Sequence, residues 1–197
     1  HTTKQEIRTV DDLKGVRLRA STRQASEFLE SVGATPVSMP PSQIADSLSK
    51  GVLDGVITVW ELLPATKLDE TTFHHMQVAD NQAAPVLTIL AVLMNKQSYE
   101  RMPDDLKAIL DKHSGEALTM RFARSWKTAT EKAEQQVAAM PRQHVYEWDA
   151  DAYQALKEKS QPVVDNWLAS TKGGIDRQAL FDGLETLVKD QAPDLAR

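Results

Sequence analysis

A short stretch of sequence that begins with two arginines could hold an anion. Residues 17–22 read Arg-Leu-Arg-Ala-Ser-Thr. We interpret them as the end of a strand, a cation at its tip, and then a helix capped by Ser21 or Thr22. The forked guanidinium of Arg19 could hold a carboxylate through two hydrogen bonds, and the start of a helix also favours an anion. A structural salt bridge is the alternative role for either arginine.

The elements around this stretch follow the pattern of a parallel α/β protein. We expect strands at residues 16–20, 35–39 and 56–59, separated by helices at residues 22–32 and 43–50. Two consecutive strand–helix–strand crossovers imply that the three strands are parallel. Ligands bind outside the carboxyl ends of the strands in such a sheet. The sequence therefore predicts one binding edge.

Four residues at this edge are candidate ligand contacts: Arg19, Ser21, Thr58 and Trp60. Trp60 could form a flat wall against an apolar or aromatic ligand, although a tryptophan that is simply packed in the core is the alternative. Thr58 could donate a hydrogen bond to an acid. Arg17 lies nearer the middle of its strand, where both faces should be apolar, so we expect it to reach solvent or pair with an acid.

The second half of the chain predicts a further set of strands and long helices. Its most apolar run, residues 85–95, has the composition of a fully buried strand. The other predicted elements are strands at 72–79 and 145–148 and helices at 97–102, 104–140, 150–169 and from 177 after an Asp176 cap.

Composition excludes several classes of function. The net charge of −5 gives no nucleic-acid surface, and the absence of cysteine excludes disulfides and thiolate metal sites. The longest apolar run is far shorter than the roughly 20 residues needed to span a bilayer. His74 and His75 point to opposite faces of a strand and cannot easily bind one ion. We therefore expect no metal, no cofactor and no catalytic residues.

Three motifs, in order and at matching spacing, resemble the solute-binding subunits of tripartite ATP-independent periplasmic (TRAP) transporters of the dicarboxylate type. They are DLKGVRLR at 12–19, LxxxGATPVxMP at 29–40 and LxxGVLDG at 48–55, with a fourth at 95–106. The resemblance covers essentially the whole chain. It implies two α/β lobes joined by crossing strands and a long helix, with the ligand in the cleft between them.

The resemblance also gives Arg19 a role, because the arginine that closes this strand grips the substrate carboxylate in the family. Thr58 replaces an asparagine that contacts ligand in many members, and Trp60 follows it, so we expect an apolar or aromatic acid. We predict a periplasmic receptor that binds a small organic acid and delivers it to the membrane subunits of a transporter. The alternative is an α/β enzyme acting on a small carboxylate, for which Glu61 is the only candidate base.

The resemblance implies a first-lobe segment of roughly a hundred residues before the first motif, whereas this chain starts a few residues before it. We therefore expect a C-terminal fragment. Residues 1–84 would form the ligand-binding core of the second lobe, with a parallel βαβαβ sheet. Residues 85–130 would normally contribute a strand and a helix to the first lobe, and residues 131–197 would be helices packing on the second. A homodimer or a domain-swapped assembly would cover the exposed apolar faces, and a chain that lacks half of its cleft would not bind ligand.

Overall fold

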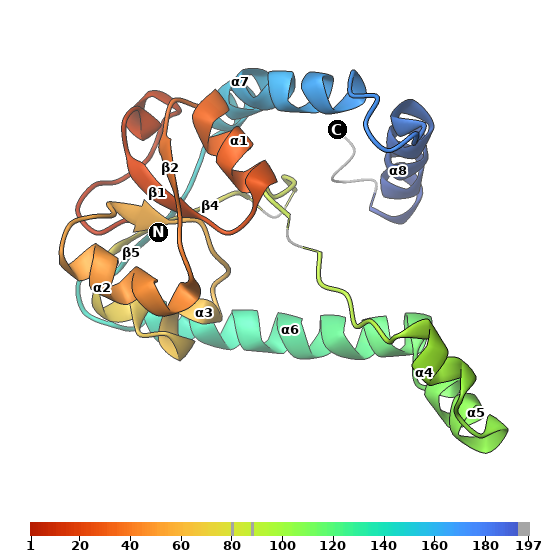
Figure 1. The fold of residues 1–197 in the computed structure, drawn as a ribbon. Helices are drawn as coiled ribbons and strands as arrows, with labels where there is room; N and C mark the ends of the chain where they lie inside the picture. Colours follow the sequence, from red (N-terminus) through yellow and green to blue (C-terminus); the bar gives the residue numbers. More distant parts are fainter. Residues whose placement is uncertain (80, 88, 193–197) are drawn as a thin grey trace.

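The computed structural model describes residues 1–79, 81–87 and 89–192 (Figure 1). Its strands are β1 Arg17–Ala20, β2 Thr35–Ser38, β3 Gly55–Val56, β4 His74–Gln77 and β5 His144–Glu147. Its α-helices are α1 Arg23–Ser31, α2 Ile44–Ser49, α3 Leu62–Ala65, α4 Lys96–Glu100, α5 Asp104–Lys112, α6 Gly115–Ala138, α7 Ala150–Leu168 and α8 Arg177–Gln191. Three short 3-10 helices complete it: η1 Asp11–Leu13, η2 Pro41–Gln43 and η3 Leu68–Glu70.

The strands form two parallel groups, as the crossover pattern predicted. Strand β1 lies between β2 and β3, and β4 pairs with β5. Thr2 joins the groups, because its backbone bridges antiparallel to both Gly55 and His74. The predicted α/β fold with a parallel βαβαβ core is thereby confirmed.

Helices cover both faces of this sheet. Helices α1 and α7 share one apolar cluster with β1, and α2, α3 and the end of α6 share a second cluster with β3. Because successive side chains of a strand point to opposite faces, Leu18 and Ala20 enter the first cluster, whereas Arg17 and Arg19 lie on the face of the second. Figure 1 shows α6 leaving the sheet region and carrying α4 and α5 at its far end.

Residues 85–95 are not the buried strand that their composition predicted. In the described part of this run, which excludes residue 88, no residue is in a strand, and Leu87, Ile89 and Leu93 are 79, 85 and 87% exposed. A buried strand needs a neighbouring strand to pair its backbone N–H and C=O groups. Neither sheet pairs with this run within the described residues. Apolar composition indicated burial without identifying a neighbour.

The predicted helix at 104–140 is two helices. Helix α5 ends at Lys112 and α6 begins at Gly115, whose φ of +59° lies in the left-handed region that glycine adopts readily. The strand predicted at 56–59 is also shorter. It ends at Val56 because the chain turns, and Leu62 N donates to the carbonyl of Val59.

The C-terminal helices differ in how they meet the rest of the chain. Helix α7 buries Ala152 and Leu156 in the first cluster, beside α1. Helix α8 has no buried residue, although all of it lies in the described part of the chain. Of the two C-terminal helices, α7 therefore packs on the sheet and α8 buries no side chain.

Arg17 pairs with an acid, as expected for its place in the strand. Its Nη2 and Nε atoms lie 2.6 and 2.8 Å from the two carboxylate oxygens of Asp54, and its backbone N–H donates to the same side chain. Hydrogen bonding from Arg17 lowers the pKa of Asp54. Asp54 thus links the start of β1 to the residue before β3.

Replacing Asp54 by alanine should lower the free energy of unfolding by about 1–2 kcal/mol. The two side chains are partly exposed, which limits the ion pair, but the backbone N–H of Arg17 also loses its acceptor. The matched control is Asp46→Ala, which breaks only the exposed i,i+4 pair with Lys50 and should cost less than about 0.5 kcal/mol. Urea denaturation measures both; equal losses would contradict the linking role of Asp54.

Candidate ligand-binding site

Arg19 is a buried cation with no acid beside it. Its register partners on the neighbouring strands are Val37 and Val56, and its side chain is only 8% exposed. Its Nε and Nη2 atoms each lie 3.4 Å from the carbonyl oxygen of Met39, which is long for a hydrogen bond. No carboxylate in the described ranges pairs with it. The alternative role of a salt bridge therefore applies to Arg17 and not to Arg19.

Burial leaves the Arg19 charge poorly solvated. Loss of hydration lowers the pKa of its guanidinium from the ordinary value, although an arginine stays charged in proteins. A positive charge that has lost water and found only a carbonyl 3.4 Å away gains most from a bound anion. The position chemically suits a ligand carboxylate.

Of the two hydroxyl residues after β1, one caps a helix and the other is exposed. Thr22 is the N-cap of α1, because its side-chain oxygen accepts a hydrogen bond of 3.1 Å from the backbone N–H of Ala25. Ser21 makes no such cap and is exposed. Of the two cap candidates the structure thus selects Thr22, and it leaves Ser21 on the surface next to the end of β1.

Thr58 and Trp60 follow β3 at the same edge of the sheet, since β3 lies parallel beside β1. Thr58 is half-buried, and its carbonyl lies 3.3 Å from Nε2 of His1. Trp60 is packed in the second cluster with 8% exposure, and its ring meets those of His1 and His75 at centroid distances of 5.0 and 5.3 Å. The four predicted residues thus lie on adjacent strand ends, and their contact with a ligand stays a prediction.

Behind Trp60 lies a buried polar chain that the sequence did not reveal. His75 is fully buried; its Nε2 lies 2.6 Å from Oε1 of Gln143, whose Nε2 donates to the carbonyl of Asp69. Nε2 of His75 must therefore carry the proton, and its Nδ1 accepts from the Nδ1 of His1, 2.8 Å away. Burial lowers the pKa of His75 to about 4. In the sequence, only the position of His75 on one face of a predicted strand could have indicated its burial.

Two of the other histidines stack on each other at the second pair of strands. His74 and His144 are register partners whose rings stack at 5.2 Å and 12°, and His75 lies on the opposite face of the strand, as expected. Within the ranges that the structure describes, no group of three histidine or acidic side chains is arranged to hold a metal ion. The same ranges contain no helix that is long and apolar enough to cross a bilayer.

Glu61, the only candidate base for an enzyme, is engaged by another element. Its Oε2 accepts a hydrogen bond of 3.1 Å from the hydroxyl of Thr130 in α6, and its Oε1 is buried without a hydrogen-bond partner. This contact ties the loop after β3 to the long helix. The side chain therefore has a structural partner in α6.

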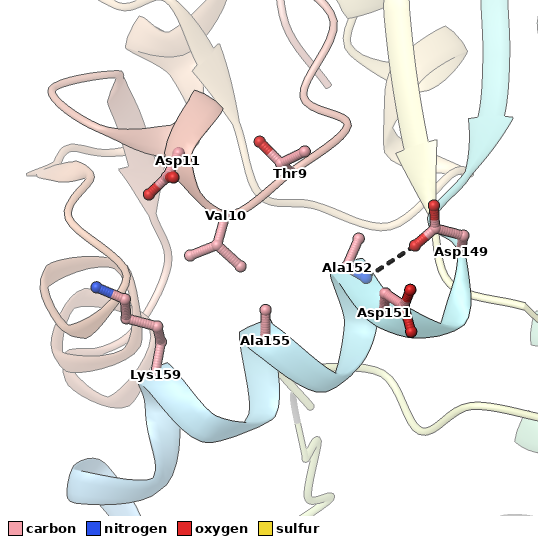
Figure 2. A pocket seen from close by; sticks show the side chains of 8 residues that line it. All are labelled: Thr9, Val10, Asp11, Asp149, Asp151, Ala152, Ala155 and Lys159. Atoms are coloured by element: carbon pink, nitrogen blue, oxygen red, sulfur yellow. Dashed lines mark hydrogen bonds between the residues drawn. The ribbon is translucent and has the colours of Figure 1, made fainter.

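A hollow elsewhere on the molecule is chemically unsuited to an organic acid. Figure 2 shows it between the segment around Asp11 and the first turns of α7. Its volume is about 410 Å³. Three carboxylates, those of Asp11, Asp149 and Asp151, line it together with the single amine of Lys159. Asp149 is also occupied as the N-cap of α7. The excess of negative charge disfavours an anionic ligand.

A family model described as DctP, bacterial extracellular solute-binding protein, family 7, matches residues 1–171. The chain belongs to this family. The resemblance drawn from the three motifs is thereby confirmed.

Solved structures of TRAP solute-binding proteins resemble this family 7 chain closely. One from Rhodoferax ferrireducens, in complex with copurified benzoate, is 31% identical and has a TM-score of 0.85 over 96% of this chain and 59% of its own. One from a marine metagenome, specific for aromatic acid ligands and bound to meta-hydroxyphenylacetate, is 27% identical, with a TM-score of 0.84 over 98% and 60%. The ectoine-binding protein of Halomonas elongata shares the fold at 18% identity, with a TM-score of 0.72 over 92% and 56%.

This chain therefore spans about three fifths of the length of the proteins that it matches. The family and the matched structures are solute-binding proteins of transporters and not enzymes. The family 7 match thus leaves the enzyme alternative without support, in agreement with the engagement of Glu61 by α6.

Proposed function

We propose that this chain supplies the acid-gripping part of a periplasmic receptor that binds an aromatic carboxylate and delivers it to the membrane subunits of a TRAP transporter. The observation that carries the proposal is Arg19, a buried guanidinium at the carboxyl edge of a parallel sheet with no acid partner in the described residues. Parallel α/β proteins bind their ligands at this edge.

The geometry of Arg19 favours a carboxylate over the contact that it now makes. Charge-assisted hydrogen bonds between arginine and a carboxylate are typically about 2.7–2.9 Å long and are often paired. The two 3.4 Å approaches to the Met39 carbonyl are longer than that and go to a neutral acceptor. A ligand carboxylate would thus replace a weak contact with two strong ones.

An aromatic acid is supported by the relatives and by the composition of the edge. The proteins described with benzoate and with meta-hydroxyphenylacetate are 31% and 27% identical to this chain. Thr58 takes the place of an asparagine found in many family members, and its single hydroxyl offers a polar ligand fewer hydrogen bonds than an amide does.

Residues 85–130 belong, in this proposal, with a part of the receptor that corresponds to the unmatched length of the relatives. Their apolar side chains lie on an extended arm, where Leu106, Ile109, Met120, Phe122 and Trp126 are all at least 41% exposed. The unmatched two fifths of the relatives would cover this arm. Two copies of the chain, as a dimer or a domain-swapped assembly, would cover it in another way, and the mass measured by sedimentation distinguishes the two.

Calorimetric titration with benzoate tests the proposal in two proteins. One is the 197-residue chain; the other is the same chain completed with the unmatched portion of the Rhodoferax ferrireducens protein, its folding checked by circular dichroism. We expect benzoate to bind and benzamide, which has the same shape without the charge, to bind at least about tenfold more weakly. Binding in the completed form alone would identify a half-site in this chain. No binding in either protein would overturn the proposal.

A further inference from the structure

The loop after β3 turns two apolar side chains toward the interior and two toward solvent. Trp60 and Leu63 are 8% and 0% exposed, and both belong to the second cluster. Val59 and Leu62 are 42% and 40% exposed. Leu62 N donates to the carbonyl of Val59, so these two residues are one turn apart. The buried pair fixes the loop, and the exposed pair forms a small apolar patch.

This patch lies at the same edge as Arg19. The loop leaves the sheet at Val56, which is the register partner of Arg19, and Ile57 N donates to the carbonyl of Arg19. Val59 comes three residues after Val56 and therefore lies beyond the carboxyl end of β3. Val52, which is 50% exposed, precedes β3 and lies at the opposite end of that strand.

A cation at the same edge of the sheet as exposed apolar side chains matches a ligand with one charged end and one apolar body. An aromatic ring placed on Val59 and Leu62 would remove apolar surface from water on both sides, which is worth about 25 cal/mol per Å². The hydroxyls of a sugar acid placed there would lose water without gaining partners, because neither side chain can hydrogen-bond. The same patch would therefore favour one class of acid and disfavour the other.

We propose that Val59 and Leu62 form the apolar wall of the acid site and determine its preference for aromatic over polyhydroxylated carboxylates. This inference rests on the proposed function, since it assumes that Arg19 holds the carboxylate. The sequence suggested Trp60 as the wall of the site, but its ring is almost entirely packed in the second cluster. In this proposal its exposed neighbours form most of the wall instead.

The test compares benzoate with glucuronate in Val59→Thr and Leu62→Asn, using the form that binds benzoate in the titration above. Each variant should weaken benzoate about tenfold and leave glucuronate unchanged or tighter. Leu62→Met, which keeps an apolar side chain, should restore benzoate binding. Val52→Thr, an equally exposed change at the other end of β3, should alter neither affinity. Circular dichroism confirms that each variant is folded.

The outcomes separate this inference from the function on which it rests. An unchanged ratio of the two affinities, or an equal loss of both, overturns the apolar wall while Arg19→Ala still abolishes binding. If Arg19→Ala leaves both affinities intact, the proposed function fails and the wall fails with it.

Discussion

Replacing Arg19 by alanine should reduce the affinity for benzoate by about thirtyfold to a few thousandfold, close to complete loss in a calorimetric titration. Removing one partner of a desolvated, hydrogen-bonded charge pair costs about 2–5 kcal/mol, and a factor of ten corresponds to about 1.4 kcal/mol. The carboxylate of the ligand would be left beside Val37 and Val56, which offer no donor. Among the described residues, Arg19 is the side chain at this edge whose charge is buried without an acid partner, so we expect one substitution to remove most of the affinity.

Two variants on the same strand sharpen the Arg19 result. Arg19→Lys keeps the charge and loses the planar fork, so we expect an intermediate loss of about tenfold. Arg17→Ala removes the arginine two residues earlier on the same face, whose guanidinium is engaged by Asp54. It should destabilise the fold and leave the affinity of the folded protein nearly unchanged. Loss of binding in Arg17→Ala and retention in Arg19→Ala would reverse the assignment of the two arginines.

The second large effect is a loss of stability in mild acid. His75 is held neutral in the folded protein with a pKa of about 4, whereas an unfolded histidine has a pKa of about 6.5. The unfolded chain therefore binds a proton first as the pH falls, and folding stability is lost progressively below pH 6.5. Each unit of difference is worth about 1.4 kcal/mol, so His75 alone should lower the free energy of unfolding by about 2 kcal/mol between pH 7 and pH 5.

Urea denaturation at several pH values between 7 and 5 measures this slope. Burial also lowers the pKa of His74, which adds to the slope in the same direction. The buried amino group of His1, whose pKa burial lowers to about 5, adds to the slope as well. His75→Gln should therefore remove only the part of the pH dependence that His75 contributes, whatever it does to stability at pH 7. His113→Gln, which changes an exposed ring at the end of α5, should keep the dependence of the unaltered protein. A slope that His75→Gln leaves intact would place the titration elsewhere.

Local patterns predicted the parts of this molecule that local physics determines. The spacing of apolar residues and of glycines gave the two crossovers, and the position of each arginine along its strand, near the middle or at the outlet, separated Arg17 from Arg19. The same reasoning placed Arg19, Ser21, Thr58 and Trp60 at one edge. These results depend on periods of two and 3.6 residues and on the handedness of crossovers, which a short window of sequence contains.

Contacts between distant residues could not be predicted in this way. His75 meets Gln143, 68 positions away, and no local pattern links the two. Trp60 likewise packs in a cluster with Ala133 and Val137, which lie far from it in the sequence. The run at 85–95 shows the converse error, because its apolar composition indicated burial, whereas Val86 alone among its described residues packs against a core cluster.

The long helix α6 is attached to the sheet only near one end. Thr130 is bonded to Glu61, and Ala133 and Val137 are buried, whereas residues 119–129 are all exposed. At 1.5 Å per residue, the unattached part from Gly115 to Thr130 is a rigid rod of about 22 Å. A rotation of about 5° at the attached end therefore sweeps the far end through about 2 Å. The helix has the mechanics of a lever, with its fulcrum one hydrogen bond away from the loop that carries Val59 and Leu62.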